Sequence, residues 1–337
     1  MERTSRRNFI KQTGLGLTAA ILPFGLVSFK KYDIMEQDVS FFDVIIIGGS
    51  YAGLSAGMAL GRALKKVLIV DNGHPCNIQT PHSHNFLTQD GQTPSEIAGV
   101  AKKQVMHYDT IQFYEGLAIM ANKISKGFEV CMVSGDVFKA KKLIFATGVK
   151  DIMPQLEGFG ACWGKSIIHC PFCHGYEVRN RTTGILGNGD AGFEFAKMLL
   201  NWTSDLTLFT NGPSTLTEVQ HKKLQQHNIK VIEKPIAYFE QRNGYLEQIV
   251  FNDLTDFALE VLYAKLPFVQ HCVLPFALGC DLTAQGLIKV NEFQKTSVYG
   301  IYACGDSANV LRSVSNAVAS GTVAGAMTNK EISDDEF

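Results

Sequence analysis

The stretch FDVIIIGGSYAGLSAGMALGRALKKVLIVDNG, residues 42–73, decides the fold. A continuous apolar run, residues 44–47, enters a glycine-rich turn, and an Ala- and Leu-rich segment then leads to a second apolar run that ends at Asp71. Continuous apolar runs predict strands buried on both faces of a parallel sheet, and the segment between them is long enough for a helix. This order of strand, turn, helix and strand is the one that a dinucleotide-binding fold requires.

The turn has the residues that a pyrophosphate needs, and we predict that Gly48, Gly49, Ser50 and Gly53 bind one. Gly48 permits the tight turn, a small residue at position 50 lets the backbone approach the phosphates, and Gly53 lets helix and strand pack closely. The helix N-terminus adds amide donors and partial positive charge. Asp71 is placed to accept hydrogen bonds from a ribose hydroxyl. Ser50 stands where a glycine is usual, and a glycine-rich turn without a ligand is the alternative interpretation.

A second unit of the same kind lies in TTGILGNGDAGFEFAKMLLNW, residues 182–202, with a strand expected at 183–186 and a helix at 193–202. Its turn glycines are Gly187, Gly189 and Gly192. The next apolar strand ends near Asn211, where an acid would suit NADH and arginines would suit the 2′-phosphate of NADPH, but the sequence has neither. The unit therefore either binds NADPH or NADH through its glycines or is an inherited fold that no longer binds a nicotinamide nucleotide.

Composition sets the outer limits. The chain has 337 residues, enough for two domains, because hydrophobic cores usually divide beyond about 250 residues. A formal net charge of −1 offers no overall attraction to nucleic acid, so no nucleic-acid partner is predicted. Eight cysteines are too sparse for a disulfide scaffold, and only Cys170 and Cys173 stand close together.

That cysteine pair lies in HCPFCH, residues 169–174, between the two nucleotide-type units. A zinc site would need two further ligands at a recognisable spacing, and the sequence has no second C-x-x-C, although His169 and His174 could contribute; no metal is predicted. An inert structural disulfide is a further alternative. Two residues between the cysteines is a spacing typical of exchangeable pairs, which favours thiol–disulfide chemistry.

Together, GGSYAG (48–53), ATG (146–148), CPFC (170–173) and CGD (304–306) resemble the low-molecular-weight thioredoxin reductase family of FAD-dependent pyridine nucleotide-disulfide oxidoreductases, from about residue 41 to 329. The resemblance implies an α/β fold with two Rossmann-like dinucleotide-binding domains. The FAD domain would be discontinuous, with a first part at 41–150 and a second part at 282–330. A NAD(P)-type domain carrying the C-x-x-C would be inserted at 151–281.

The resemblance also implies further flavin contacts. Thr147 and Gly148 end the strand of KLIFATGV (142–149), and Gly305 and Asp306 follow a strand at 301–303. Asp306 would bind the ribityl chain, and the small-residue helix after it, residues 314–327, would point its N-terminus at the isoalloxazine. Asn85, in SHNFLTQDG (83–91), is a candidate contact, with a simple loop as the alternative. Homodimers and a thioredoxin-like protein or small dithiol or disulfide as partner are also implied.

By the same resemblance Cys173 exchanges electrons with the flavin and Cys170 with the external substrate. Thioredoxin reductases usually have an aspartate directly after the second cysteine, whereas this chain has His174 there and His169 before the first. A histidine can take a thiol proton near neutral pH and stabilise the thiolate, so His174 is the first candidate base and His169 the second. For each, a solvated turn histidine is the alternative.

The two departures from the family pattern indicate a direction of electron flow. The basic stretch for NADPH is replaced by FTNGPSTL (209–216), and the aspartate is replaced by a histidine. In this the chain resembles the branch of dithiol oxidases, which pass electrons from substrate thiols through flavin to oxygen. Three functions stay open: a thioredoxin reductase-like enzyme with NADPH or NADH as donor, a dithiol oxidase that needs neither, and a non-catalytic flavin redox sensor.

The N-terminus reads as an export signal, residues 1–32. SRRNFIK (5–11) places two arginines before an uncharged apolar run, 14–29, that is shorter than the roughly 20 residues of a spanning helix. We predict export by the twin-arginine route to a periplasmic or membrane-attached location, where a signal that is not cleaved would tether the protein to the membrane. A cytoplasmic protein with an amphipathic N-terminal helix is the alternative.

Overall fold

The computed structural model of this chain describes residues 41–337. The predicted export signal and the tether, residues 1–32, lie outside the described residues. Within the described residues no helix is both long and apolar enough to cross a lipid bilayer.

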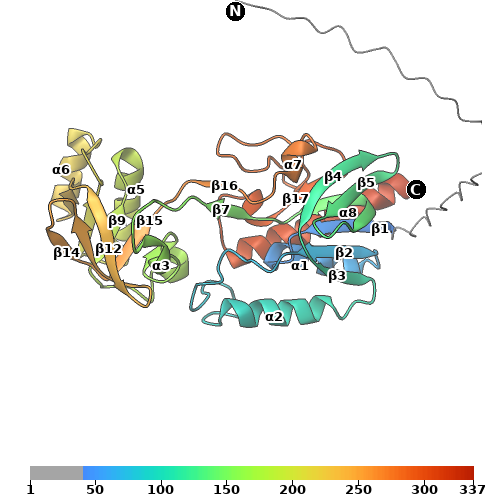
Figure 1. Ribbon diagram of the computed structural model, residues 1–337, viewed down its shortest axis with the longest axis horizontal. Coiled ribbons are helices and arrows are strands. Elements are labelled where there is room, and N and C mark those ends of the chain that lie inside the picture. The colour runs from blue at the N-terminus through green and yellow to red at the C-terminus, as the bar shows by residue number, and fades with distance from the viewer. Residues whose placement is uncertain (1–40) are drawn as a thin grey trace, which may run out of the picture. The chain divides into compact units, whose positions relative to one another are not determined.

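A seven-stranded sheet organises the first unit. Its strands are β1 (Phe41–Ile47), β2 (Val67–Asp71), β3 (Ile111–Glu115), β4 (Ala118–Ile124), β5 (Gly127–Met132), β6 (Val137–Phe145) and β17 (Ile301–Ala303). The order is β3-β2-β1-β6-β5-β4, with β17 pairing β6 (Figure 1). The strands β1, β2, β3, β6 and β17 pair in parallel, while β4, β5 and β6 pair antiparallel.

The pairing of β6 shows that this unit is built from two separated parts of the chain. Its beginning pairs with β5, and its end, Leu143–Phe145, pairs with Ile301–Ala303 of β17. All three residues at that end of β6 are fully buried, as the apolar run predicted. Because β17 comes far later in the sequence, the chain leaves this sheet and returns to it, which confirms the predicted discontinuous fold class.

The helices of the first unit are α1 (Tyr51–Arg62), α2 (Pro94–Val105), α7 (Leu274–Ala277) and α8 (Val314–Glu336), with a 3-10 turn at Gly305–Ser307. α1 and α8 pack closely because α8 has glycines at the contact; a Cβ at Gly321 would overlap the carbonyl oxygen of Ala52. α8 is longer than the predicted 314–327. Its last turns are held by Lys142 of β6, whose Nζ lies 2.7 Å from Glu331 Oε1 and 2.6 Å from Asp335 Oδ2.

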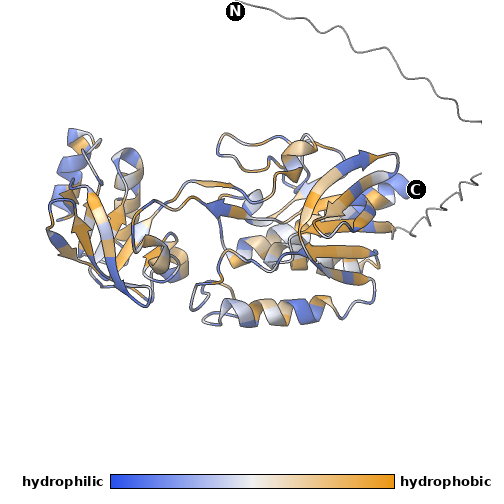
Figure 2. Ribbon diagram, viewed as in Figure 1, coloured by the Kyte–Doolittle hydropathy of each residue, from blue (hydrophilic) through white to orange (hydrophobic). Residues whose placement is uncertain are grey.

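The second unit has a five-stranded parallel sheet in the order β11-β10-β9-β15-β8 and a three-stranded antiparallel sheet, β12-β13-β14. Its strands are β8 (Ile167–Ile168), β9 (Thr183–Leu186), β10 (Leu206–Phe209), β11 (Lys230–Ile232), β12 (Ile236–Arg242), β13 (Tyr245–Phe251), β14 (Asp256–Ala258) and β15 (Val261–Ala264). Its helices are α3 (Phe159–Cys162), α4 (Pro171–His174), α5 (Gly189–Leu199) and α6 (Glu218–Gln226). Figure 2 shows β1 and β2 as mostly apolar and α6 as mostly polar. This agrees with sheet strands that are buried in the core and a helix that is exposed to solvent.

α5 ends at Leu199, so the expectation that the helix reaches Trp202 is wrong. The chain turns there, with the Trp202 amide donating to the Leu199 carbonyl at 2.9 Å. The turn brings the Trp202 ring edge-on to Phe172, between the two cysteines, at 5.5 Å between ring centroids.

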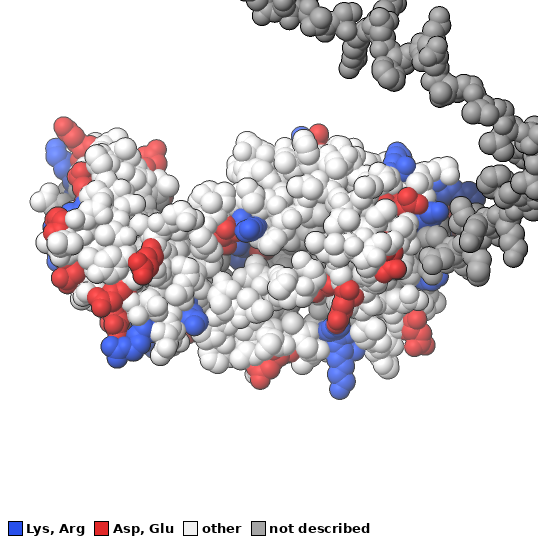
Figure 3. Space-filling view, in the orientation of Figure 1, with Lys and Arg blue, Asp and Glu red and all other residues white. Residues whose placement is uncertain are grey.

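Two short antiparallel strands, β7 (Val149–Asp151) and β16 (Phe268–Gln270), run between the two sheets. After β16, Leu274 and Cys280 are buried in the same apolar cluster as Phe145 and Ile301 of the first sheet. This packing favours a return to the first unit ahead of residue 281, and the boundaries at 150 and 281 stay predictions. Figure 3 shows charges of both signs interspersed on the visible face, as expected of a chain with almost no net charge.

Candidate active site

The β1–α1 turn has the close backbone approach that its glycines predict. Gly48 has φ of +106°, in the region that favours glycine, and a Cβ there would overlap the carbonyl oxygen of Ala146. A Cβ at Gly53 would overlap the carbonyl oxygen of Gly48. Ser50 is the N-cap of α1, and its side chain makes no capping bond, so it leaves the first-turn amides of the helix to an anion. The Gly49 amide donates to Asp71 Oδ1 at 3.0 Å, which fixes the acid at the end of β2 beside the turn.

This turn opens into a cavity of about 640 Å³, within the range of small-molecule and cofactor sites. The predicted site residues that line it are Gly48, Gly49, Ser50, Asp71, Thr147, Gly148, His169, Cys173, His174, Gly305 and Asp306. Of the other predicted residues in the described part of the chain, Gly53, Asn85 and Cys170 lie outside the lining, as do the second-unit glycines 187, 189 and 192. The structure therefore gathers most of the predicted flavin residues, both predicted histidines and one cysteine around one cavity.

The cavity has the features that an adenine–flavin dinucleotide would need. The glycines of the turn leave its backbone accessible, and the first amides of α1 are uncapped. Asp71 lies at the end of β2, where a hydrogen-bond acceptor for the ribose is expected. Thr147 Oγ1 is buried and makes no hydrogen bond within the described residues, so it is available to a ligand. These residues fit FAD.

An ion cluster lines part of the cavity, and two of its members, Asp151 and Arg312, were not among the residues predicted from the sequence. The Arg312 guanidinium donates to both carboxylate oxygens of Asp151, at 2.6 and 3.0 Å, and its Nε lies 3.5 Å from Asp306 Oδ2. Burial raises the pKa of Asp306, and Arg312 counters part of that effect. The Cys76 thiol lies 4.0 Å from the same carboxylate, and Cys76 is exposed to solvent.

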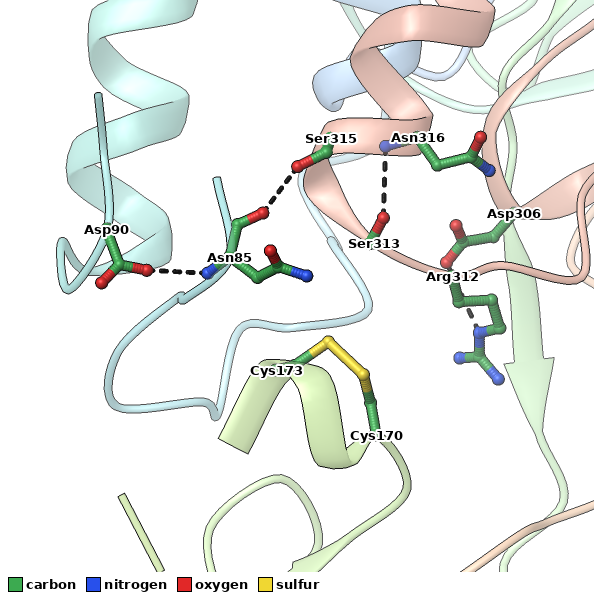
Figure 4. The surroundings of a disulfide bond; sticks show 9 residues. All are labelled: Asn85, Asp90, Cys170, Cys173, Asp306, Arg312, Ser313, Ser315 and Asn316. Carbon is green, nitrogen blue, oxygen red and sulfur yellow. Dashed lines mark hydrogen bonds and ion pairs between the residues drawn. A yellow bond between two sulfur atoms is a disulfide. The ribbon is translucent and has the colours of Figure 1, made fainter. Parts of the chain in front are cut away.

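Cys170 and Cys173 form a disulfide with their Cα atoms 5.3 Å apart. Cys170 is the N-cap of α4, and Pro171 at the first helical position sets the backbone that brings the two cysteines together. Figure 4 shows the Cys173 end of the bond below Asn85, with the N-terminus of α8 and its cap, Ser313, on the same side. Cys173 faces the cavity that the flavin residues line.

Both histidines that flank the cysteines line the cavity and are held as neutral imidazoles. His169 stacks on Trp163, with 5.8 Å between ring centroids, and its Nε2 makes no hydrogen bond within the described residues. Burial, followed by the charge of Arg312, lowers the pKa of His169 to about 4. Burial, followed by the charges of His169 and His84, lowers the pKa of His174 to about 4. At neutral pH each ring is therefore unprotonated, and a pKa of about 4 makes it a weaker base than a free histidine.

The second glycine turn is closed by its own side chains. Asn188 Oδ1 accepts from the amides of Gly189 and Thr215, each at 2.8 Å, and Asn188 Nδ2 donates to the Pro213 carbonyl at 2.9 Å. At the start of α5, Gln220 Nε2 donates to Asp190 Oδ1 at 2.6 Å. These contacts occupy the start of the helix, where a pyrophosphate would lie.

The position where the sequence lacks a ribose-binding acid is also occupied. Asn211, in the left-handed region with φ of +51°, accepts from the Ile236 amide at 2.7 Å. Its side chain is therefore used within the fold.

Within residues 41–337 no group of three or more histidine, cysteine, aspartate or glutamate side chains is placed to hold a metal ion.

The fold and the site together define a class of protein. The chain belongs to the pyridine nucleotide-disulphide oxidoreductase family, which it matches over residues 42–321. Within that family it is 33% identical over 301 residues to the thioredoxin reductase tcpT of Claviceps purpurea, covering 86% of this chain and 94% of that one. The solved structure of an oxidoreductase from Agrobacterium tumefaciens matches with a TM-score of 0.82 and 36% identity over 88% of this chain and 99% of that one.

The solved structure of a thioredoxin reductase from Streptococcus pyogenes shares the fold. It matches with a TM-score of 0.80 and 19% identity over 87% of this chain and 99% of that one. The protein is thus a thioredoxin reductase-like oxidoreductase and a flavoprotein enzyme. The cofactors of this family are FAD and NADPH, in line with the cofactor prediction.

Proposed function

We propose that the protein moves electron pairs between FAD and an external dithiol or disulfide through Cys170 and Cys173. The observation that supports this proposal is the division between the two sulfurs: Cys173 lines the cavity of the flavin residues, and Cys170 lies outside that lining. One cysteine is therefore placed for the cofactor and the other for a substrate. The exposed aromatic rings of Phe172 and Tyr176 beside the pair offer an apolar surface to that substrate.

In the oxidising direction, a substrate thiolate attacks Cys170, and the Cys170–Cys173 bond breaks to leave Cys173 as a thiolate. The second substrate thiolate then attacks the mixed disulfide and releases the substrate disulfide and the Cys170 thiolate. The two substrate protons need acceptors, and His174 is the nearer candidate by position, with His169 second. FAD supplies the two-electron acceptor that restores the cysteine disulfide. In the reducing direction the same bonds form and break in reverse order.

Serine variants test the role of the pair. We expect Cys170→Ser and Cys173→Ser to keep the absorbance of bound flavin and to lose dithiol–disulfide turnover by about a thousandfold or more, because the exchangeable bond cannot form. Cys131→Ser, at a free cysteine on β5, is the matched control and should turn over like wild type. Turnover that persists in Cys173→Ser would refute the proposal. A wild type that binds flavin but turns over no dithiol would instead indicate the redox sensor.

A second candidate function, an oxygen-dependent dithiol oxidase, is favoured by the closed glycine turn of the second unit. Asn188, Asp190 and Asn211 make their hydrogen bonds within the fold. A nicotinamide dinucleotide would have to displace the Asn188 and Asp190 contacts, and it would gain neither an acidic ribose acceptor nor an arginine pair for a 2′-phosphate at the end of β10. The reductase with NADPH or NADH as donor is the competing function.

Titration calorimetry with NADPH and with NADH separates the two functions. The oxidase predicts no saturable binding at micromolar nucleotide, and Asn188→Ala, which frees the turn, is expected to bind no worse than wild type. Micromolar binding to the wild-type protein would favour the reductase.

Three further features are proposals that rest on the family resemblance and on residues 1–32. They are a homodimer, a thioredoxin-like protein or small dithiol as partner, and twin-arginine export with a membrane tether. Light scattering of the purified protein tests the first, and fractionation of cells that produce a twin Lys variant at Arg6 and Arg7 tests the last.

A further inference from the structure

The loop of residues 83–92 is fixed on both sides of His84. The Ser83 amide donates to the Gln92 carbonyl at 2.8 Å, and the Gly91 amide donates to the Ser83 carbonyl at 2.9 Å. On the other side, the Asn85 amide donates to Asp90 Oδ1 at 2.7 Å, and Ser315 at the start of α8 donates to the Asn85 carbonyl at 2.7 Å (Figure 4). The backbone of His84 is therefore held in place against α8.

From this loop the His84 side chain reaches across to the unit that carries the cysteines. It lines the cavity, and its Nδ1 lies 3.6 Å from Glu177 Oε1 and 3.7 Å from Asp90 Oδ1. Nδ1 is buried and makes no hydrogen bond within the described residues, so the two carboxylates act on it through their charge. His84 also lies close enough to His174 for its charge to lower the pKa of that ring.

The short helix α4 ends at His174, and Glu177 lies three residues further along the chain. α4 has only four residues, one turn of hydrogen bonds, and so depends on contacts outside itself to stay in place. One such contact is the Phe172–Trp202 pair within its own unit. The His84–Glu177 pair is a contact with the other unit, and its histidine lines the cavity.

We propose that His84 is a positioning residue for the redox pair. By attracting Glu177 it holds the segment after α4 against the 83–92 loop, and so keeps Cys173 and His174 at the flavin cavity. The inference rests on the proposed exchange of electrons between Cys173 and FAD. The charged and titratable groups that face this ring are Asp90 on its own loop and His174 and Glu177 on the other unit.

The test measures the rate at which dithiothreitol reduces the bound flavin without oxygen, in His84→Gln, Glu177→Gln and the double variant. Each single substitution is expected to slow this rate about fivefold, the scale of a partly exposed ion pair, and the double variant is expected to be no slower than either single one. Reduction of the flavin by dithionite, which needs no cysteine, should be unchanged.

Two matched controls separate this role from a general effect of the substitutions. His107→Gln removes an exposed histidine of the first unit, and Glu260→Gln removes an exposed carboxylate of the second unit that lies 3.7 Å from Arg181. Both should reduce at the wild-type rate. Equal rates for wild type and His84→Gln, or additive losses in the double variant, would overturn the positioning role while leaving the proposed function intact. A wild-type flavin that dithiothreitol cannot reduce would overturn both.

Discussion

Replacing Arg312 should lower the thermal stability of the protein, because the side chain belongs to a buried ion pair. Its bidentate contact with Asp151 joins β7, the strand between the two sheets, to the loop before α8, and the two side chains are only 16% and 10% exposed. Asp306, 3.5 Å from the same guanidinium, is 18% exposed. Arg312→Met leaves both carboxylates buried without a counter-charge. Breaking one such pair costs about 3–5 kcal/mol, which for a unit of this size corresponds to a fall in Tm of roughly 6–20 °C.

The assay is thermal unfolding followed by circular dichroism, with saturating FAD so that cofactor loss does not add to the shift. The matched control is Lys330→Met. It breaks an exposed pair with Asp334, one turn away on α8, and should cost no more than about 0.5 kcal/mol. Arg312→Met with Asp151→Leu should recover part of the loss, because one uncompensated charge is removed as well. A Tm for Arg312→Met within about 2 °C of wild type would show that the Arg312–Asp151 pair does not stabilise the fold to the predicted extent.

Three other substitutions test separate parts of the account. Gly53→Ala would place a Cβ on the carbonyl oxygen of Gly48 and should weaken FAD binding about tenfold or more, measured by flavin fluorescence on dilution; unchanged affinity would count against the predicted turn. His174 has a pKa lowered to about 4 from 6.5, so its contribution to stability is complete above pH 6.5 and is lost as the pH falls towards 4. His174→Gln should therefore lose about 2 kcal/mol less than wild type between pH 7 and pH 4 in urea unfolding, after allowance for partial exposure, and should also slow flavin reduction by dithiols; an equal acid sensitivity would contradict the first point. Lys142→Ala should lower the free energy of unfolding by about 3 kcal/mol, because it leaves Glu331, 8% exposed, without its closest buried partner, and thermal unfolding of the variant checks this.

The parts of the fold that could be predicted from the sequence are those set by local pattern. The strands predicted at 183–186 and 301–303 match β9 and β17, which are largely buried, as expected of strands in parallel sheets. The glycine turn after β1 was predictable for a similar reason: only glycine fits a backbone with φ of +106° packed against Ala146. The helix ends were less predictable, since α8 is extended by ion pairs with Lys142 of β6 that no local pattern indicates.

The parts of the site that the sequence did not reveal depend on the return of the chain to its first sheet. Arg312 meets Asp151 only because β17 and α8 come back beside β6 and β7, and neither residue lies in a recognisable motif. His84 meets Glu177 across the two units in the same way. The closed turn at Asn188 was hidden for a different reason: its glycines have the usual spacing, and only the side-chain contacts show that the turn is already occupied.

The most direct test of the central claim is the absorbance of the bound flavin after anaerobic mixing, in one experiment, with dithiothreitol, with NADPH and with NADH. We expect dithiothreitol to bleach the flavin of the wild-type protein but not that of Cys173→Ser, and we expect air to restore the colour with release of peroxide. Rapid bleaching by NADPH or NADH would mean that the second unit still binds a nicotinamide nucleotide and that the enzyme works as a reductase. Bleaching of Cys173→Ser by the dithiol at the wild-type rate would contradict the claim that electrons reach FAD through the cysteine pair.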